Sequence, residues 1–178
     1  DQEKGGQYFY PDWRSKTPWG DTRPNYESGP VRQYLRDNMM MRLEEYHVDG
    51  IRTDGTLFIR RETSLDNGGT DFPEGWTLLQ WLNDEGHKLD PPAFIIAEDL
   101  QHDASLTTGT EHGGAGFDAQ WDPQFVYRMR DMIASPEDKE RSPGAVAELL
   151  PARFNGDPFQ SIIFTENHDV AAHGSARI

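Results

Sequence analysis

The chain contains no cysteine. This absence excludes thiol catalysis, disulfide bonds and thiolate metal sites, and it favours a cytoplasmic setting. No apolar run approaches the roughly 18 residues of a membrane-spanning helix, and no basic-then-apolar leader opens the chain. We therefore expect no membrane-embedded segment.

Basic residues are also scarce, with 17 Lys and Arg against 31 Asp and Glu, so the formal net charge is −14. A surface of this sign repels phosphate groups, which argues against nucleic acid and anionic membranes as partners. It is compatible with a neutral ligand such as a sugar. The oligomeric state stays open.

Metal and cofactor signals are missing too. The six histidines include no His-Glu-x-x-His motif and no pair at i, i+4 spacing, so we expect no zinc site. The oxygen-rich stretch 66–71 does not match an EF-hand loop, and we interpret it as a solvated loop. The expectation is a protein without metal or cofactor.

The 178 residues are enough for one domain with a sizeable core. Residues 1–30 are rich in Gly, Pro and aromatic residues and predict a long irregular loop, which the aromatics mark as functional rather than disordered. Beyond it, apolar spacing predicts helices and short strands in alternation, which is typical of an α/β protein with a parallel sheet. The expected helices are 31–46, one that starts over 76–82 and ends near Pro91-Pro92, 123–133 and 144–150. The expected strands are 51–54, 94–97, 117–121 and 161–165.

Three predicted strands are closed by carboxylates, namely Asp54, Glu98 and Asp169. The carboxyl ends of parallel strands share one rim, so these side chains are expected to converge there. Converging carboxylates suit glycosidic chemistry, because one can attack the anomeric carbon while another, protonated, donates to the leaving oxygen. Mutual repulsion raises the pKa of one member of such a group.

Two neighbours fit this hypothesis. Arg52 lies two residues before Asp54 on the same strand face, where it can pair with that carboxylate, and His168 can donate to a sugar hydroxyl. The alternative is that these residues are solvated caps and surface pairs, which are common at strand ends. Four tryptophans raise the same choice: helical spacing favours core packing for Trp76 and Trp81, whereas Trp19 and Trp121 are open to sugar stacking.

Three segments resemble glycoside hydrolase family 13, the α-amylase superfamily. Residues 49–54 (Asp-Gly-Ile-Arg-Thr-Asp) resemble its fourth-strand motif, residues 95–99 its fifth-strand motif, and residues 164–169 (Phe-Thr-Glu-Asn-His-Asp) its seventh-strand motif. The three occur in the family's order. By this resemblance the fold is a partial TIM (β/α)8 barrel, roughly strands four to seven with their helices.

The likeness extends to other segments of the chain. Residues 8–26 and 31–38 are similar to the region before the third barrel helix in bacterial 1,4-α-glucan branching enzymes and related trehalohydrolases, and residues 116–122 to the sixth strand of that group. Residues 1–30 would then be a loop preceding the third helix, and 31–178 part of the catalytic barrel. The other barrel strands are expected outside the chain.

The resemblance also implies roles. Asp54 would be the nucleophile, Glu98 the general acid/base and Asp169 the stabiliser of the transition state, while Arg52 and His168 would bind nucleophile and sugar. It favours a 1,4-α-glucan branching enzyme acting on an α-1,4-glucan or malto-oligosaccharide. The alternatives are an amylase-type or malto-oligosyltrehalose trehalohydrolase-type hydrolase and a non-catalytic sugar-binding relative.

Overall fold

A computed structural model of the chain describes residues 6–62, 69–151 and 153–169. Four parallel strands form one sheet in the order β1-β2-β3-β4. This arrangement, with helices between the strands, confirms the predicted α/β class. The strands are β1 (Gly50–Thr53), β2 (Phe94–Ala97), β3 (Ala119–Trp121) and β4 (Ser161–Ile162).

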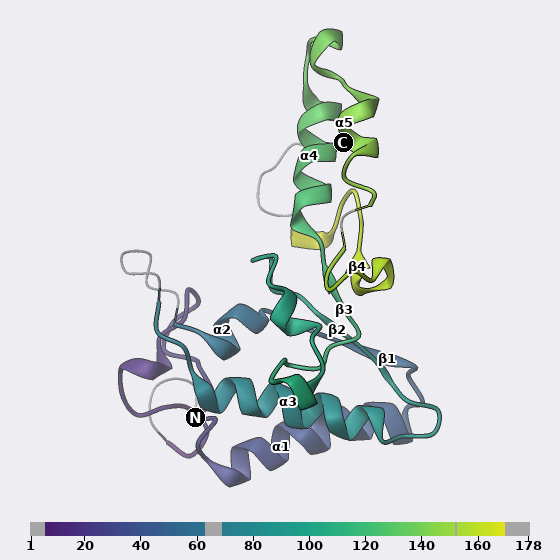
Figure 1. Cartoon of the computed structure of the whole chain (residues 1–178). Helices are drawn as coiled ribbons and strands as arrows, with labels where there is room; N and C mark the ends of the chain where they lie inside the picture. Colours follow the sequence, from purple (N-terminus) through teal and green to yellow (C-terminus); the bar gives the residue numbers. More distant parts are fainter. Residues whose placement is uncertain (1–5, 63–68, 152, 170–178) are drawn as a thin grey trace.

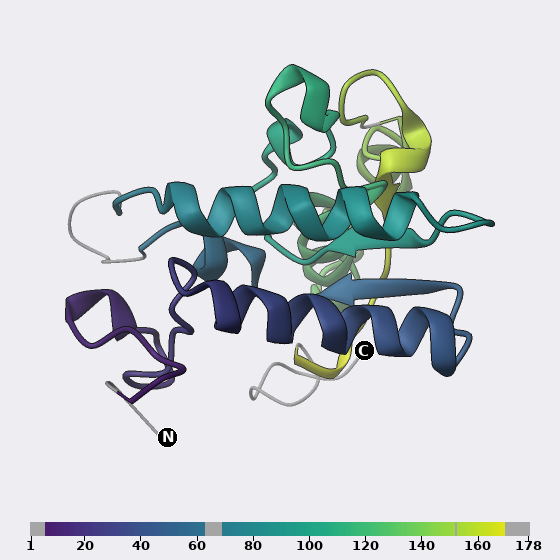
Figure 2. The same ribbon diagram turned by 90° about the horizontal axis from the view of Figure 1, so that it is seen from below.

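Two long helices cover one face of the sheet at β1 and β2. Helix α1 (Gly29–Met40), continued by the π-turn η2 (Met41–Glu45), and helix α3 (Pro73–His87) run side by side against these strands (Figures 1 and 2). Each helix has a proline in its first turn. Backbone N–H groups in this turn have no intrahelical partner, so the N–H that proline lacks is not needed there. The core between them and the strands includes Met39, Met40, Leu43, Leu79, Ile95 and Ala97.

The helix predicted over 31–46 and the helix predicted to start over 76–82 are both present, each beginning a little earlier than expected. The second ends at His87, before the prolines at 91 and 92. Trp76 and Trp81 pack partly buried against the core clusters, as their helical spacing predicted.

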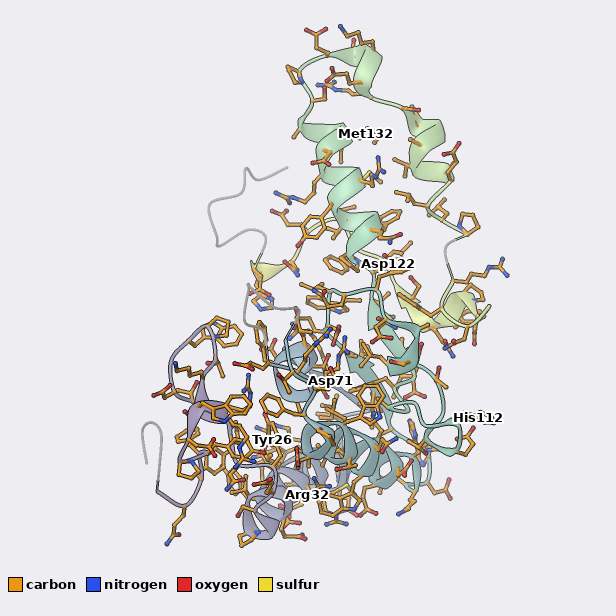
Figure 3. The ribbon with its side chains drawn as sticks, turned by 60° about the vertical axis from the view of Figure 1, so that its left-hand side comes forward. Tyr26, Arg32, Asp71, His112, Asp122 and Met132 are labelled. Atoms are coloured by element: carbon orange, nitrogen blue, oxygen red, sulfur yellow. The ribbon has the colours of Figure 1, made fainter. Side chains whose placement is uncertain are left out.

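The C-terminal helices form an arm that projects away from the body. Helix α4 (Pro123–Ala134) is capped at its N-terminus by Asp122, whose carboxylate accepts from the Gln124 amide at 3.0 Å. Helix α5 (Pro143–Ala147) packs beside α4. The arm extends well beyond the body that holds Tyr26 (Figures 1 and 3). Short 3-10 turns complete the chain at η1 (Trp13–Ser15), η3 (Ala104–Leu106), η4 (Thr110–His112), η5 (Asp138–Glu140) and η6 (Pro158–Gln160).

Several local predictions need correction. The strand expected over 161–165 spans only Ser161–Ile162, whose one strand partner in the described residues is β3. Ile163, just beyond it, is 45% exposed. In β2, Ile95 is buried, but Phe94 on the other face is 46% exposed. The short helix α2 (Thr56–Arg60) was not predicted at all.

The N-terminal segment is irregular but well packed. Arg23, 1% exposed, donates from Nε to the Phe58 carbonyl at 2.9 Å and from Nη1 to the Arg14 carbonyl at 2.6 Å. Tyr10 is fully buried and belongs to a second apolar cluster. The segment is therefore fixed to α2, the element that follows β1. Over the described ranges, no helix has the length and apolar character needed to cross a bilayer.

Candidate active site

The carboxylates of Asp54 and Glu98 follow directly on neighbouring strands. The register pairs Thr53 with Ala97, so the next residue of each strand lies at the same edge, and the Glu98 amide donates to the Thr53 carbonyl at 3.0 Å. Gly55 adopts a left-handed backbone (φ 54°), which favours glycine and turns the chain into α2. Its N–H donates to Glu98 Oε2 at 2.6 Å.

Arg52, near the end of β1, has its guanidinium close to both carboxylates. Its Nη1 lies 2.8 Å from Asp54 Oδ1, and its Nη2 lies 3.8 Å from Glu98 Oε2. The guanidinium stacks on the Trp121 ring of β3, 4.1 Å from the ring centre. The expected pairing of Arg52 with Asp54 is therefore present, and Trp121 serves as the platform that holds it.

Glu98 is the shielded member of the group, with its side chain 14% exposed against 75% for Asp54. Burial raises the pKa of the Glu98 carboxyl above its ordinary value, and the charges of Asp54 and Asp169 raise it further. The Gly55 hydrogen bond and the charge of Arg52 lower the pKa, but the raising effects are larger. The Glu98 carboxyl therefore stays protonated to a higher pH than an ordinary glutamate does.

Asp169 approaches the same place from the C-terminal segment. It lines the cavity with Asp54 and Glu98, and its side chain is 46% exposed. His168 lies beside it, with Nε2 3.3 Å from Asp169 Oδ2. The His168 side chain is 71% exposed and is not among the described residues that line the cavity, so its contact with a sugar stays a prediction.

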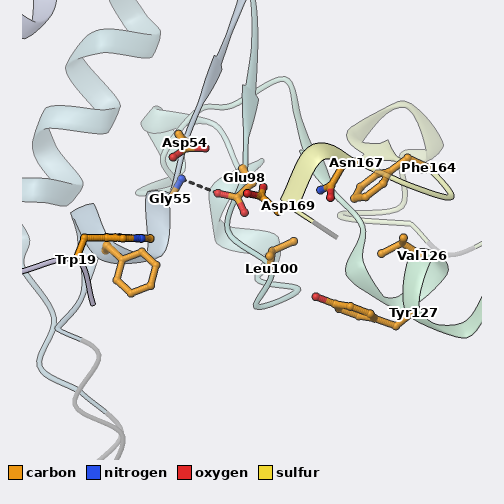
Figure 4. Close-up of a pocket in the computed structure, with 11 residues that line it drawn as sticks. Trp19, Asp54, Gly55, Glu98, Leu100, Val126, Tyr127, Phe164, Asn167 and Asp169 are labelled. Atoms are coloured by element: carbon orange, nitrogen blue, oxygen red, sulfur yellow. Dashed lines mark hydrogen bonds between the residues drawn. The ribbon is translucent and has the colours of Figure 1, made fainter. Parts of the chain in front are cut away.

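The three carboxylates share one cavity of about 230 Å³. Figure 4 shows Glu98 and Asp169 in its middle, with Trp19 to one side and Tyr127 to the other. A cavity with carboxylates at its centre and aromatic walls suits a sugar, whose ring has polar edges and apolar faces. Its lining residues are Trp19, Asp54, Gly55, Phe58, Glu98, Leu100, Val126, Tyr127, Phe164, Asn167 and Asp169.

Trp19 comes from the N-terminal segment and contacts Phe58 edge-on, with ring centroids 4.8 Å apart. Of the two tryptophans left open by the sequence, it is the one that lines the cavity, whereas Trp121 lies behind Arg52. Phe58 and Tyr127 also line the cavity, and the sequence did not indicate either as a site residue. Phe58 lies only four residues after Asp54, which is the one sequence signal that could have indicated it.

No group of three or more His, Asp or Glu side chains able to hold a metal ion occurs among the residues that the structure describes. Part of the oxygen-rich stretch, residues 66–68, lies outside the described residues. The chemical groups of the described site are carboxyl groups and a guanidinium group.

Comparison with curated proteins finds relatives over the whole chain, although no protein-family model matches. The chain is 27% identical over 190 residues to a 1,4-alpha-glucan branching enzyme of Pseudoalteromonas atlantica, covering 100% of this chain and 24% of the relative. It is 26% identical to one of Salinibacter ruber (94% and 28% covered) and 35% identical over 125 residues to one of Corynebacterium diphtheriae (64% and 17% covered). The chain thus spans about a quarter of the length of the relatives it matches along most of its length.

Solved structures share the fold. An alpha-amylase from H. orenii superposes with a TM-score of 0.54 at 17% identity, over 83% of this chain and 28% of that one. A maltogenic alpha-amylase, AmyB from Thermotoga neapolitana, gives 0.54 at 24% identity, over 86% and 30%. The predicted match to part of an α-amylase barrel is thereby confirmed.

Proposed function

Since the chain belongs to glycoside hydrolase family 13, the α-amylase superfamily, we propose that it carries the catalytic carboxylates of a 1,4-α-glucan branching enzyme. The observation that carries this proposal is the contrast between an exposed Asp54 paired with Arg52 and a shielded Glu98 whose pKa is raised. Retaining glycosidases need this division of labour, one carboxylate ionised and one carboxyl protonated.

In the first step, an Asp54 oxygen attacks the anomeric carbon of the glucan. The bond from that carbon to the leaving 4-oxygen breaks, and Glu98 donates its proton to this oxygen. The products are a glycosyl ester on Asp54 and an ionised Glu98. Arg52, whose Nη1 lies 2.8 Å from Asp54 Oδ1, orients the nucleophile before the attack.

In the second step, the Glu98 carboxylate takes the proton of a glucan 6-hydroxyl. The oxygen of that hydroxyl attacks the anomeric carbon, and the Asp54 carboxylate leaves. Two inversions retain the α configuration, and the new bond is an α-1,6 branch. Asp169, which lines the cavity, would bind sugar hydroxyls and stabilise the positive charge of the transition state, and His168 beside it would donate to a hydroxyl.

Branching is preferred to hydrolysis because the curated relatives cited above are named branching enzymes. A hydrolase would use the same first step and then give the glycosyl group to water. A non-catalytic sugar-binding relative is disfavoured because Asp54, Glu98 and Asp169 are all present in one cavity.

The test uses the complete natural protein that carries this chain. Incubated with amylose, it is expected to lower iodine staining and to form α-1,6 linkages, seen by NMR, with little new reducing sugar. The Asp54→Asn variant is expected to lose this turnover while it still binds glucan, because the amide cannot form the ester.

Abundant reducing ends without branches would replace the proposal with the hydrolase. Undiminished change of amylose with Asp54→Asn would remove Asp54 as nucleophile. Glucan binding without any turnover by the wild-type protein would favour the non-catalytic relative.

A further inference from the structure

A buried ion pair lies directly behind Glu98. Arg60, the last residue of α2, donates from Nε to Asp99 Oδ2 and from Nη2 to Asp99 Oδ1, both at 2.8 Å. The Asp99 side chain is fully buried, and that of Arg60 is 11% exposed. This two-bond geometry fixes the angle between the groups as well as their distance.

Further bonds connect the pair to the strand end. Thr56 Oγ1, at the start of α2, lies 3.0 Å from Asp99 Oδ2 and 3.0 Å from the Glu98 carbonyl oxygen. Arg60 Nη1 also lies 3.1 Å from Asp103 Oδ2. Helix α2 spans only Thr56–Arg60, too short to be stable in isolation, so its position depends on such tertiary contacts.

The position of α2 matters because Gly55, its N-cap, donates to the Glu98 carboxylate at 2.6 Å. The Thr56 amide donates to the Glu98 carbonyl at 2.9 Å. Both ends of α2 are thus attached to residues 98 and 99. A shift of α2 would withdraw the Gly55 N–H from Glu98.

We propose that Arg60 and Asp99 form a clamp that positions the Glu98 carboxyl against the Gly55 amide. The pair is a positioning device, because neither side chain is among the residues that line the cavity. Its role for turnover rests on the function proposed above, whereas its role in holding Glu98 does not.

The groups that face Glu98 determine in which direction its pKa changes when the clamp is loosened. Arg52 and Asp54 face it from the end of β1, Gly55 from α2, and Asp169 from the C-terminal segment. The Gly55 hydrogen bond is one of the contacts that lower the pKa of Glu98, so loosening the clamp raises that pKa. The basic limb of the pH–rate profile, which reports the protonated acid, then moves to higher pH.

The experiment compares three variants of the complete natural protein: Asp99→Asn, Arg60→Lys, and the double variant Arg60→Met with Asp99→Asn. The double variant leaves neither charge unpaired, so it guards against misfolding from a lone buried charge. The primary readout is the pKa of Glu98, measured by NMR of protein with ¹³C-labelled glutamate carboxyls and assigned with Glu98→Gln. The second readout is the pH dependence of kcat and KM on amylose.

We expect the pKa of Glu98 to rise in Arg60→Lys and in the double variant, which keep the net charge behind Glu98. We expect kcat to fall about 10- to 100-fold with KM nearly unchanged in all three variants, since a misplaced catalytic group costs about that factor. The control is Glu85→Gln. It breaks the Arg36–Glu85 pair (2.6 Å) between α1 and α3, so it is expected to lower stability and leave the pKa of Glu98 and the pH profile unchanged.

A folded Arg60→Lys variant or a folded double variant with the wild-type pKa of Glu98 would overturn the clamp. So would misfolding of all three variants beside a folded Glu85→Gln, because the pair would then serve the fold alone. A raised pKa in a protein that turns over no α-glucan would keep the clamp and defeat the proposed function.

Discussion

Asp54 and Glu98 lie at adjacent strand ends, yet water reaches them to very different extents, with side chains 75% and 14% exposed. Desolvation penalises only the charged form of a carboxyl, so burial raises the pKa of the Glu98 carboxyl above its ordinary value. At the residue scale, the difference in side-chain exposure supports the assignment of Asp54 as the nucleophile and Glu98 as the acid. The Arg52 guanidinium lies closer to Asp54, at 2.8 Å, than to Glu98, at 3.8 Å.

The Glu98→Gln variant tests the raised pKa of the Glu98 carboxyl. A carboxyl whose pKa is raised by folding contributes stability that is fully present below its unfolded value and is lost as pH rises through the folded value. Glutamine has no such loss. We expect Glu98→Gln to unfold at higher urea concentration than wild type at pH 8, to match it near pH 4, and to lose about 10²- to 10⁴-fold in kcat. A variant that is less stable at pH 8 than wild type would contradict the raised pKa.

At the element scale, α2 packs against α3 and is hydrogen-bonded to residues 98 and 99, which follow β2. Gly75 in the first turn of α3 lies so close to α2 that a Cβ there would come within 1.9 Å of the Ile59 carbonyl oxygen. Ile59 precedes Arg60, so any displacement of this segment would also move one half of the ion pair behind Glu98.

We therefore expect Gly75→Ala to destabilise the protein by about 1–3 kcal/mol or more, as overpacking does, and to lower kcat as well. The matched control is Gly29→Ala at the start of α1, where a Cβ would have no neighbour within 4 Å and a change within about 0.5 kcal/mol is expected. Urea unfolding and kcat measured on both variants check this. Equal stability of the two would show that α3 can move away from α2 freely.

Element prediction from sequence succeeded where periodicity was long. The apolar spacing of α1 predicted a helix because it repeats over several turns, and Phe94–Ala97 predicted a strand because turn residues bound it. Helix α2 has five residues, too few for a period to show. The length of β4 could not be predicted, because it depends on which neighbours the strand finds in space.

At the scale of the whole molecule, the parallel sheet brings Asp54, Glu98 and Asp169 together from positions far apart in the chain. Convergence of strand ends was predictable from the alternation of strands and helices. The aromatic walls were not, because Trp19 reaches the cavity only through the N-terminal segment that Arg23 ties to Phe58. Tyr127 reaches it from α4, and no local pattern indicates such a contact.

The central claim, that Asp54 carries the glycosyl group, is tested most directly by trapping the ester. In the complete protein with Glu98→Gln, an α-maltosyl fluoride can react without acid help because fluoride leaves readily, whereas the second step lacks its base. Mass spectrometry of the digested protein is expected to find the added glycosyl mass on the peptide with Asp54, and none in the double variant that also carries Asp54→Asn. A glycosyl group on another residue would contradict the account.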